Sequence, residues 1–189
     1  MMHVLAISGS LRNGSHNTAL LRAAAQLLPP PAELELYDEL KQVPPYDEDD
    51  DGEGAPAAVR HLREAVAGAD AILIATPEYN SSIPGQLKNV LDWVSRPAGG
   101  SAARGKPVAV IGASTGMFGA VWAQAEVRKV MGAIGARVLD RELPVAKADN
   151  AFTEDGRLAD LELHEQLEET LAELLSLVEQ FGEDRAVAA

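Results

Sequence analysis

Three apolar runs limit the folds open to this chain more than any other feature. They are VLAI at 4–7, AILIA at 71–75 and VAVIGA at 108–113. A strand with one wet face alternates apolar and polar residues, whereas a strand covered on both faces is apolar throughout. The runs therefore predict buried strands of a parallel sheet that lies between two layers of helices.

Segments with helical periodicity separate these strands and would supply the two layers. Further strands are predicted at Glu33–Tyr37 and Val138–Leu139. Apolar stripes at helical spacing lie within 20–28, 56–67, 87–94, 127–134 and 167–178. This alternation predicts a doubly wound α/β fold with a five-stranded parallel sheet, for which 2-1-3-4-5 is the commonest order. We expect one domain over residues 1–182 and a disordered tail at 183–189.

Composition narrows the classes of function. The chain of 189 residues has no cysteine, so thiolate chemistry and Cys-bound metals are excluded, and we expect no metal site. Redox chemistry would need a bound cofactor. The net charge of −13, without a basic stripe, disfavours nucleic acid and anionic membranes as partners. With no apolar run near the ~18 residues of a membrane span and no signal-like start, we expect a cytoplasmic protein.

Small polar residues follow the first, third and fourth predicted strands along the chain. The three loops read SGSLRNGSHN, TPEYNSSIPG and ASTGMFG. Because the carboxyl ends of parallel strands meet at one edge of the sheet, these loops should lie side by side. Open α/β sheets bind their ligands at that edge, where the strand order reverses.

The first loop has the character of a phosphate-binding loop. Gly9 and Gly14 have the spacing of a nucleoside-triphosphate loop, but Ser15 and His16 follow where lysine is required. Leu11 replaces the second glycine of a dinucleotide fingerprint. The hydroxyls, the guanidinium and the helix N-terminus instead suit one phosphomonoester, and the alternative is a helix cap without ligand. The candidate phosphate residues are Ser8, Ser10, Arg12, Ser15, Asn17 and Thr18.

The three loops also carry a family resemblance. The segments GSLRNGSHN, PEYNSSIPGQLKNVLDW and GASTGMFGA occur in this order, and FTEDGRLAD precedes the last helix. With these motifs the chain resembles the NADPH-dependent FMN reductases of the flavodoxin-like superfamily, which include chromate, quinone and azo-compound reductases. The resemblance covers nearly the whole chain. It implies a flavodoxin-like fold with FMN at the carboxyl edge of the sheet.

The resemblance also implies roles for particular residues. The six candidate phosphate residues would hold the FMN phosphate. Pro77, Glu78, Tyr79 and Asn80 would run along the isoalloxazine ring, and Ser114, Thr115 and Gly116 would lie at its pyrimidine side. Val121 and Trp122 stand where members often carry Ala-Arg, so Trp122 would either stack near the ring or simply pack.

The implied activity is that of an enzyme without a catalytic side chain of its own. It would pass a hydride from NADPH or NADH through FMN to quinone, azo, flavin or metal-oxyanion acceptors by a ping-pong mechanism. An FMN-binding electron carrier or flavin sensor without NADPH activity is the alternative. Members form homodimers or dimers of dimers, and the helix with Lys88 and Trp93 is expected at the interface. The sequence leaves the role of Lys88 open, and the acidic run Asp47–Glu53 is predicted to be a solvated loop.

Overall fold

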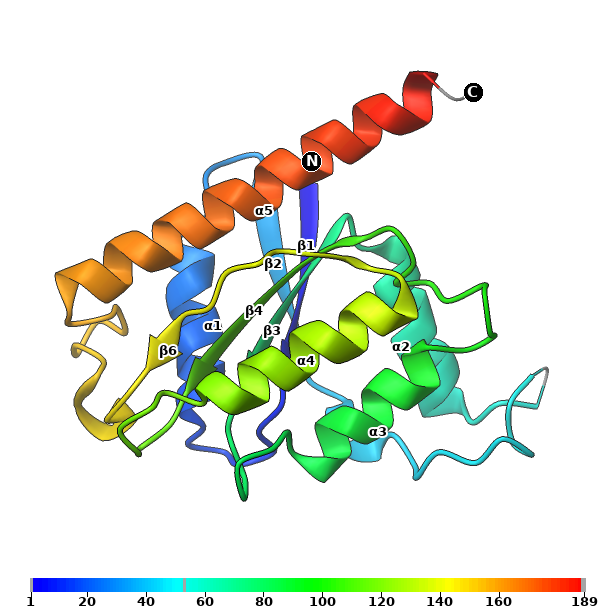
Figure 1. Ribbon diagram of the computed structural model, residues 1–189, viewed down its shortest axis with the longest axis horizontal. Helices are drawn as coiled ribbons and strands as arrows, with labels where there is room; N and C mark the ends of the chain where they lie inside the picture. The colour runs from blue at the N-terminus through cyan, green and yellow to red at the C-terminus, as the bar shows by residue number, and fades with distance from the viewer. Residues whose placement is uncertain (1, 53, 188–189) are drawn as a thin grey trace.

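The sheet has the predicted order. The computed structural model describes residues 2–52 and 54–187, and within them a parallel sheet runs β2-β1-β3-β4-β5, with a sixth strand, β6, beside β4 (Figure 1). The flavodoxin-like prediction is therefore confirmed. The strands are β1 (Met2–Ser8), β2 (Ala32–Tyr37), β3 (Ala71–Thr76), β4 (Pro107–Ala113), β5 (Arg137–Val138) and β6 (Pro144–Val145).

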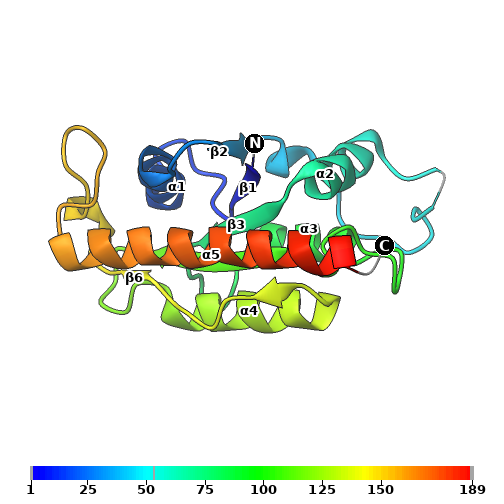
Figure 2. The same cartoon turned by 90° about the horizontal axis from the view of Figure 1, so that it is seen from above.

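Helices cover both faces of the sheet, which explains why its central strands are apolar throughout. The helices are α1 (His16–Leu27), α2 (Ala57–Gly68), α3 (Gly85–Val94), α4 (Val121–Ile134) and α5 (Leu161–Val187). Leu5 and Ile7 of β1 belong to a core shared with α2, α3 and α4, whereas Val4 and Ala6 belong to a core shared with α1 and α5. Figure 2 shows α1 and α4 on opposite sides of the strands.

The structure differs from the predicted fifth strand. In place of one strand at Val138–Leu139, the chain forms β5 at Arg137–Val138 and then returns to β4 as β6. β5 pairs with the beginning of β4 and β6 with its end, so the edge is completed in two short pieces. Each piece is two residues long, which is too short to give a periodic signal in the sequence.

Two short turns lie in the loops after β2 and β6. Single 3₁₀ turns occur at η1 (Leu40–Gln42) and η2 (Ala148–Asn150). Helix α5 continues to Val187 and so enters the segment 183–189 that was expected to be a disordered tail, while residues 188 and 189 lie outside the described residues. None of the described helices combines the length and the apolar character that a bilayer crossing requires.

Candidate functional site

The loops after β1, β3 and β4 enclose a cavity of about 280 Å³ at the carboxyl edge of the sheet. Most of the predicted site residues line it, together with two that were not predicted, His16 and Ala113. The lining residues are Ser10, Arg12, Ser15, His16, Asn17, Pro77, Glu78, Tyr79, Ala113, Ser114 and Thr115. The three loops are thus brought together as the topology requires.

The N-terminus of α1 forms one end of the cavity. Ser15 caps this helix, since its Oγ accepts a hydrogen bond of 3.2 Å from the backbone N of Thr18. Other N–H groups of a first helical turn have no partner inside the helix, so they favour an anion. Arg12 is exposed and forms no salt bridge within residues 2–52 and 54–187. A free guanidinium beside a helix N-terminus is a donor set that fits a phosphate group.

Two of the six candidate phosphate residues lie in a neighbouring cavity. Thr18 donates its hydroxyl to Ser8 at 2.9 Å, and both side chains line a cavity of about 280 Å³ next to Tyr37 and Lys41. Ser10 and Arg12 line both cavities. The structure therefore brings four of the six residues into the main cavity.

Asn17 is buried and already engaged by the backbone of β4. Its Nδ2 donates to the carbonyl of Ala113, and its Oδ1 accepts from the N–H of the same residue, both at 2.9 Å. This pair of bonds ties the start of α1 to the end of β4. Asn17 thereby positions the first and third loops relative to each other, in addition to lining the cavity.

The loop after β3 is a tight hairpin. The backbones of Tyr79 and Ser82 exchange hydrogen bonds of 3.0 and 3.1 Å, and the two residues between them, Asn80 and Ser81, have φ angles of 54° and 60°. Two residues with positive φ are the mark of a type I′ turn, in which asparagine is favoured. Tyr79 lines the cavity, whereas Asn80 occupies the tip of the turn and does not line it.

Glu78 has a structural partner that the sequence did not suggest. Its Oε2 accepts hydrogen bonds from the backbone N of Trp122 at 3.1 Å and of Ala123 at 3.2 Å. Helix α4 has no cap of its own, because the preceding residue, Ala120, has no side-chain acceptor and lies in the left-handed region at φ 62°. Glu78 therefore supplies the cap and the negative charge that this helix N-terminus lacks.

A second carboxylate joins the hairpin to α4. Glu126 accepts a hydrogen bond of 2.6 Å from the Ser82 hydroxyl and one of 3.3 Å from the backbone N of Ile83. These two donors, the hydroxyl above all, hold the pKa of Glu126 below its ordinary value. Together, Glu78 and Glu126 fix the second loop against α4.

Hydrogen bonds from the segment after β6, residues 146–150, hold the third loop in place. Lys147 N donates to the carbonyl of Gly116, and Gly116 N donates to Ser114 Oγ, so Gly116 supports the loop without lining the cavity. Gly119 has a φ of 55°, and a Cβ there would lie 2.3 Å from the Pro144 carbonyl carbon, so only glycine fits.

His16 lines the cavity, although no role was predicted for it. Its Nε2 lies 3.1 Å from Asp149 Oδ1, and its ring lies parallel to that of Phe152 with centroids 6.4 Å apart. Both partners come from the segment after β6, which the sequence could not place near α1. The position of His16 directly after the helix cap was the available signal.

Trp93 belongs to the core. It is fully buried, and its indole N–H donates to the carbonyl of Pro44 at 2.9 Å.

The acidic run Asp47–Glu53 is held at Asp51, which forms a 2.8 Å salt bridge with Arg63. Glu53, also part of that run, lies outside the described residues.

Comparisons with known proteins identify the family of this chain. The sequence model of the family described as NADPH-dependent FMN reductase matches residues 2–150. An NAD(P)H-dependent FMN reductase of Pseudomonas aeruginosa is 44% identical over 172 residues, which are 90% of this chain and 92% of that protein. A quinone reductase of Pseudomonas putida is 37% identical over 158 residues, covering 83% of this chain and 84% of that protein.

A solved structure is similar over nearly the whole chain. FerB, a flavoenzyme NAD(P)H:(acceptor) oxidoreductase from Paracoccus denitrificans, superposes with a TM-score of 0.84 at 32% identity, covering 96% of this chain and 99% of that one. The family match spans more than half of the chain, and the relatives match over most of their own length. This chain belongs to the NADPH-dependent FMN reductase family.

Proposed function

We propose that this protein is an FMN-dependent NAD(P)H oxidoreductase that reduces quinone-type acceptors, and that residues 1–182 form its single FMN-binding domain. The observation that carries the proposal is the cavity at the carboxyl edge of β1, β3 and β4, where Arg12, which has no salt-bridge partner among the described residues, lies beside the N-terminus of α1. The family match and the names of the relatives, which are FMN reductases and quinone reductases, support it.

The FMN phosphate would be held at the α1 end of the cavity. Arg12 would supply charge, and the hydroxyls of Ser10 and Ser15 would donate to phosphate oxygens. Asn17 would act by fixing the α1 N-terminus against β4, and Ser8 and Thr18 by supporting the loop from the neighbouring cavity.

The isoalloxazine ring would lie between the second and third loops. Pro77 and Tyr79 would flank it on one side, and Ser114 and Thr115 on the other, with Asn80 and Gly116 shaping the loop turns. When bound, FMN supplies the chemistry, since it takes a hydride from NAD(P)H and passes the reducing equivalents to the acceptor. The side chains then only bind and orient, because the one carboxylate in the lining, Glu78, is committed to α4.

NAD(P)H and the acceptor would use the same open space in turn, which gives ping-pong kinetics. Relatives named 2-hydroxy-1,4-benzoquinone reductase and quinone reductase favour quinones as acceptors. Azo compounds, free flavin and metal oxyanions such as chromate are the wider set that we propose. Dependence on NAD(P)H also favours a cytoplasmic location.

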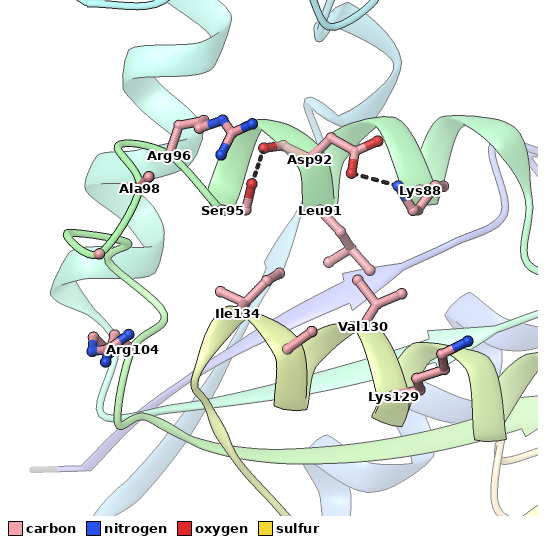
Figure 3. A pocket seen from close by; sticks show the side chains of 12 residues that line it. Lys88, Leu91, Asp92, Ser95, Arg96, Ala98, Arg104, Lys129, Val130 and Ile134 are labelled. Atoms are coloured by element: carbon pink, nitrogen blue, oxygen red, sulfur yellow. Dashed lines mark hydrogen bonds and ion pairs between the residues drawn. The ribbon is translucent and has the colours of Figure 1, made fainter.

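We further propose a homodimer, or a dimer of dimers, that forms over the groove between α3 and α4. This groove has a volume of about 430 Å³ (Figure 3). Apolar side chains, among them Leu91, Val130 and Ile134, line its floor, as is usual for an interface between copies. Lys88 lies at its edge, where it pairs with Asp92 of the same helix.

Anaerobic half-reactions test the activity. The protein is loaded with FMN, NADPH or NADH is added, and the flavin absorbance is followed; a quinone is then added without further reductant. We expect the absorbance to be bleached by NAD(P)H and restored by the quinone. An FMN-loaded protein that neither NADPH nor NADH reduces would contradict the proposal and identify an electron carrier or flavin sensor instead.

A further inference from the structure

The cavity that Ser8 and Thr18 line adjoins the flavin site at its proposed phosphate end. It lies between the loop after β1 and the segment after β2, two strands that pair side by side in the sheet (Figure 1). Ser10 and Arg12 line both this cavity and the main one. Its volume of about 280 Å³ is several times the ~30 Å³ of one water molecule, so it has room for more than a single ion. We call it the β2 cavity.

Charged side chains of both signs line the β2 cavity without pairing. Asp38 directly follows β2, Lys41 lies in η1, and Arg12 comes from the first loop. All three are exposed, and none of them forms a salt bridge within residues 2–52 and 54–187. Two cations against one carboxylate give this cavity an excess of positive charge on a chain whose net charge is −13. Such a cavity favours an anion, and both cations are donors that suit phosphate oxygens.

The rest of the lining suits a nucleoside. Leu11, Leu36 and Leu40 provide apolar surface, and Leu11 is 44% exposed, so a flat base that covers it would remove apolar area from water. A carboxylate accepts hydrogen bonds from ribose hydroxyls in α/β folds that bind dinucleotides, and Asp38 is the carboxylate available here. Partners for a phosphate, a ribose and a base are thus present in one cavity.

We propose that the β2 cavity binds the AMP group of FAD, so that this chain accepts FAD as well as FMN. FAD is FMN with AMP joined to its phosphate, and the inference rests on the proposed function for the position of that phosphate. Arg12 then lies between the two phosphates, and Lys41 binds the second one. Asp38 accepts from the ribose, and the base covers Leu11.

The shared side chain Arg12 favours FAD over the AMP group of a separate nicotinamide dinucleotide. It connects the β2 cavity to the phosphate end of the flavin site, whereas the nicotinamide has to reach the flavin ring between the second and third loops. The ring of FAD occupies the same place as that of FMN, so the proposed hydride transfer is unchanged.

Calorimetric titrations of the apo-protein with FMN and with FAD test the β2 cavity without any turnover. We expect FAD to bind at least as tightly as FMN, because the AMP group adds contacts and meets no obstruction. Weaker binding of FAD than of FMN to the wild-type protein would overturn the proposal.

Variants at the β2 cavity assign the difference to particular side chains. In Lys41→Ala we expect the Kd of FAD to rise about fivefold to tenfold, and in Asp38→Ala about threefold, while the Kd of FMN stays within about twofold of wild type. The FMN titration also shows whether each variant is folded, and either variant alone decides the matter. Equal effects on both flavins, or an effect on neither, would overturn the proposal.

Arg22→Ala is the matched control. Arg22 is an exposed cation within α1 that lines neither cavity, so both Kd values should stay at the wild-type level. An equal rise in the Kd of FAD in Arg22→Ala would show that only net charge matters, which would overturn the assignment.

One further titration separates the two sources of an AMP group. Oxidised, FMN-loaded protein is titrated with NADP⁺, and Lys41→Ala should leave its Kd unchanged. If Lys41→Ala weakens NADP⁺ and not FAD, the β2 cavity serves the dinucleotide and the proposal is overturned. The proposed function fails separately, when the protein binds neither flavin or when NAD(P)H does not reduce the bound FMN.

Discussion

Removing the Glu78 carboxylate should destabilise α4 from its first turn. The cap consists of two backbone bonds, of 3.1 and 3.2 Å, to a helix that has no acceptor of its own at the N-terminus. Loss of a helix cap costs about 0.5–2 kcal/mol, and loss of a negative charge at this end costs a further 0.3–1 kcal/mol or so. For Glu78→Ala we therefore expect the free energy of unfolding to fall by about 2 kcal/mol.

For a chain of this length, that loss corresponds to a decrease in Tm of about 4–8 °C. The Glu78→Gln variant keeps an oxygen acceptor and loses only the charge, so its decrease should be about a third as large. Thermal melts and urea titrations measure both variants. Glu64→Ala is the matched control, since Glu64 is an exposed glutamate within α2, and its Tm should change little.

Amide hydrogen exchange localises the effect. The backbone N–H groups of Trp122 and Ala123 should exchange faster in Glu78→Ala, while those of α1 keep their wild-type rates. If the Tm of Glu78→Ala equals that of Glu64→Ala, and the amides of Trp122 and Ala123 keep their wild-type exchange rates, then the Glu78 carboxylate does not cap α4. The proposed link between the second loop and α4 would then be wrong.

Three further predictions concern charge and burial. Arg12→Ala should weaken FMN binding about tenfold to a hundredfold in a fluorescence titration, since a hydrogen bond to a charged group is worth about 1.5–3 kcal/mol; unchanged affinity would refute the phosphate assignment. Burial, followed by the charges of Glu39 and Asp38, raises the pKa of Tyr37 to about 12. The wild type should therefore lose stability as the pH rises from 10 towards 12, because only the unfolded chain ionises there. Tyr37→Phe should abolish that loss, and it should raise the free energy of unfolding by about 1 kcal/mol because the buried hydroxyl has no hydrogen-bond partner among the described residues. The lowered pKa of Glu126 gives stability that is present above its ordinary pKa of 4.5 and lost as the pH falls through the lowered value. Urea titrations across that range should show a smaller loss for Glu126→Gln than for wild type, and equal losses would contradict the bonds from Ser82 and Ile83.

The fold was predictable because its central strands carry a strong local signal. Val4 and Ala6 pack on one face of the sheet and Leu5 and Ile7 on the other. The uninterrupted apolar run VLAI therefore indicates a strand that is buried on both faces. The strand order followed because 2-1-3-4-5 is the commonest order of a five-stranded, doubly wound parallel sheet. β6 was missed because its two residues, Pro144–Val145, form no period and depend on the end of β4 for pairing.

The site was predictable as a set of loops, but the roles within it were not. Glu78 is 44 residues away from its partner Trp122, and Asn17 is 96 residues away from Ala113. Side-chain contacts over such separations leave no trace in local spacing. The motif could place Glu78 at the site, yet only the structure shows that its carboxylate faces a helix N-terminus.

A comparison of FMN with riboflavin tests the central claim most directly, because the two ligands differ only in the phosphate. Apo-protein is titrated with each flavin, and flavin fluorescence gives the two Kd values. With Arg12 and the α1 N-terminus as phosphate partners, we expect FMN to bind about a hundredfold more tightly than riboflavin, and Arg12→Ala to remove most of that difference. Equal affinities for the two flavins in the wild-type protein would contradict the assignment of this cavity as the FMN site.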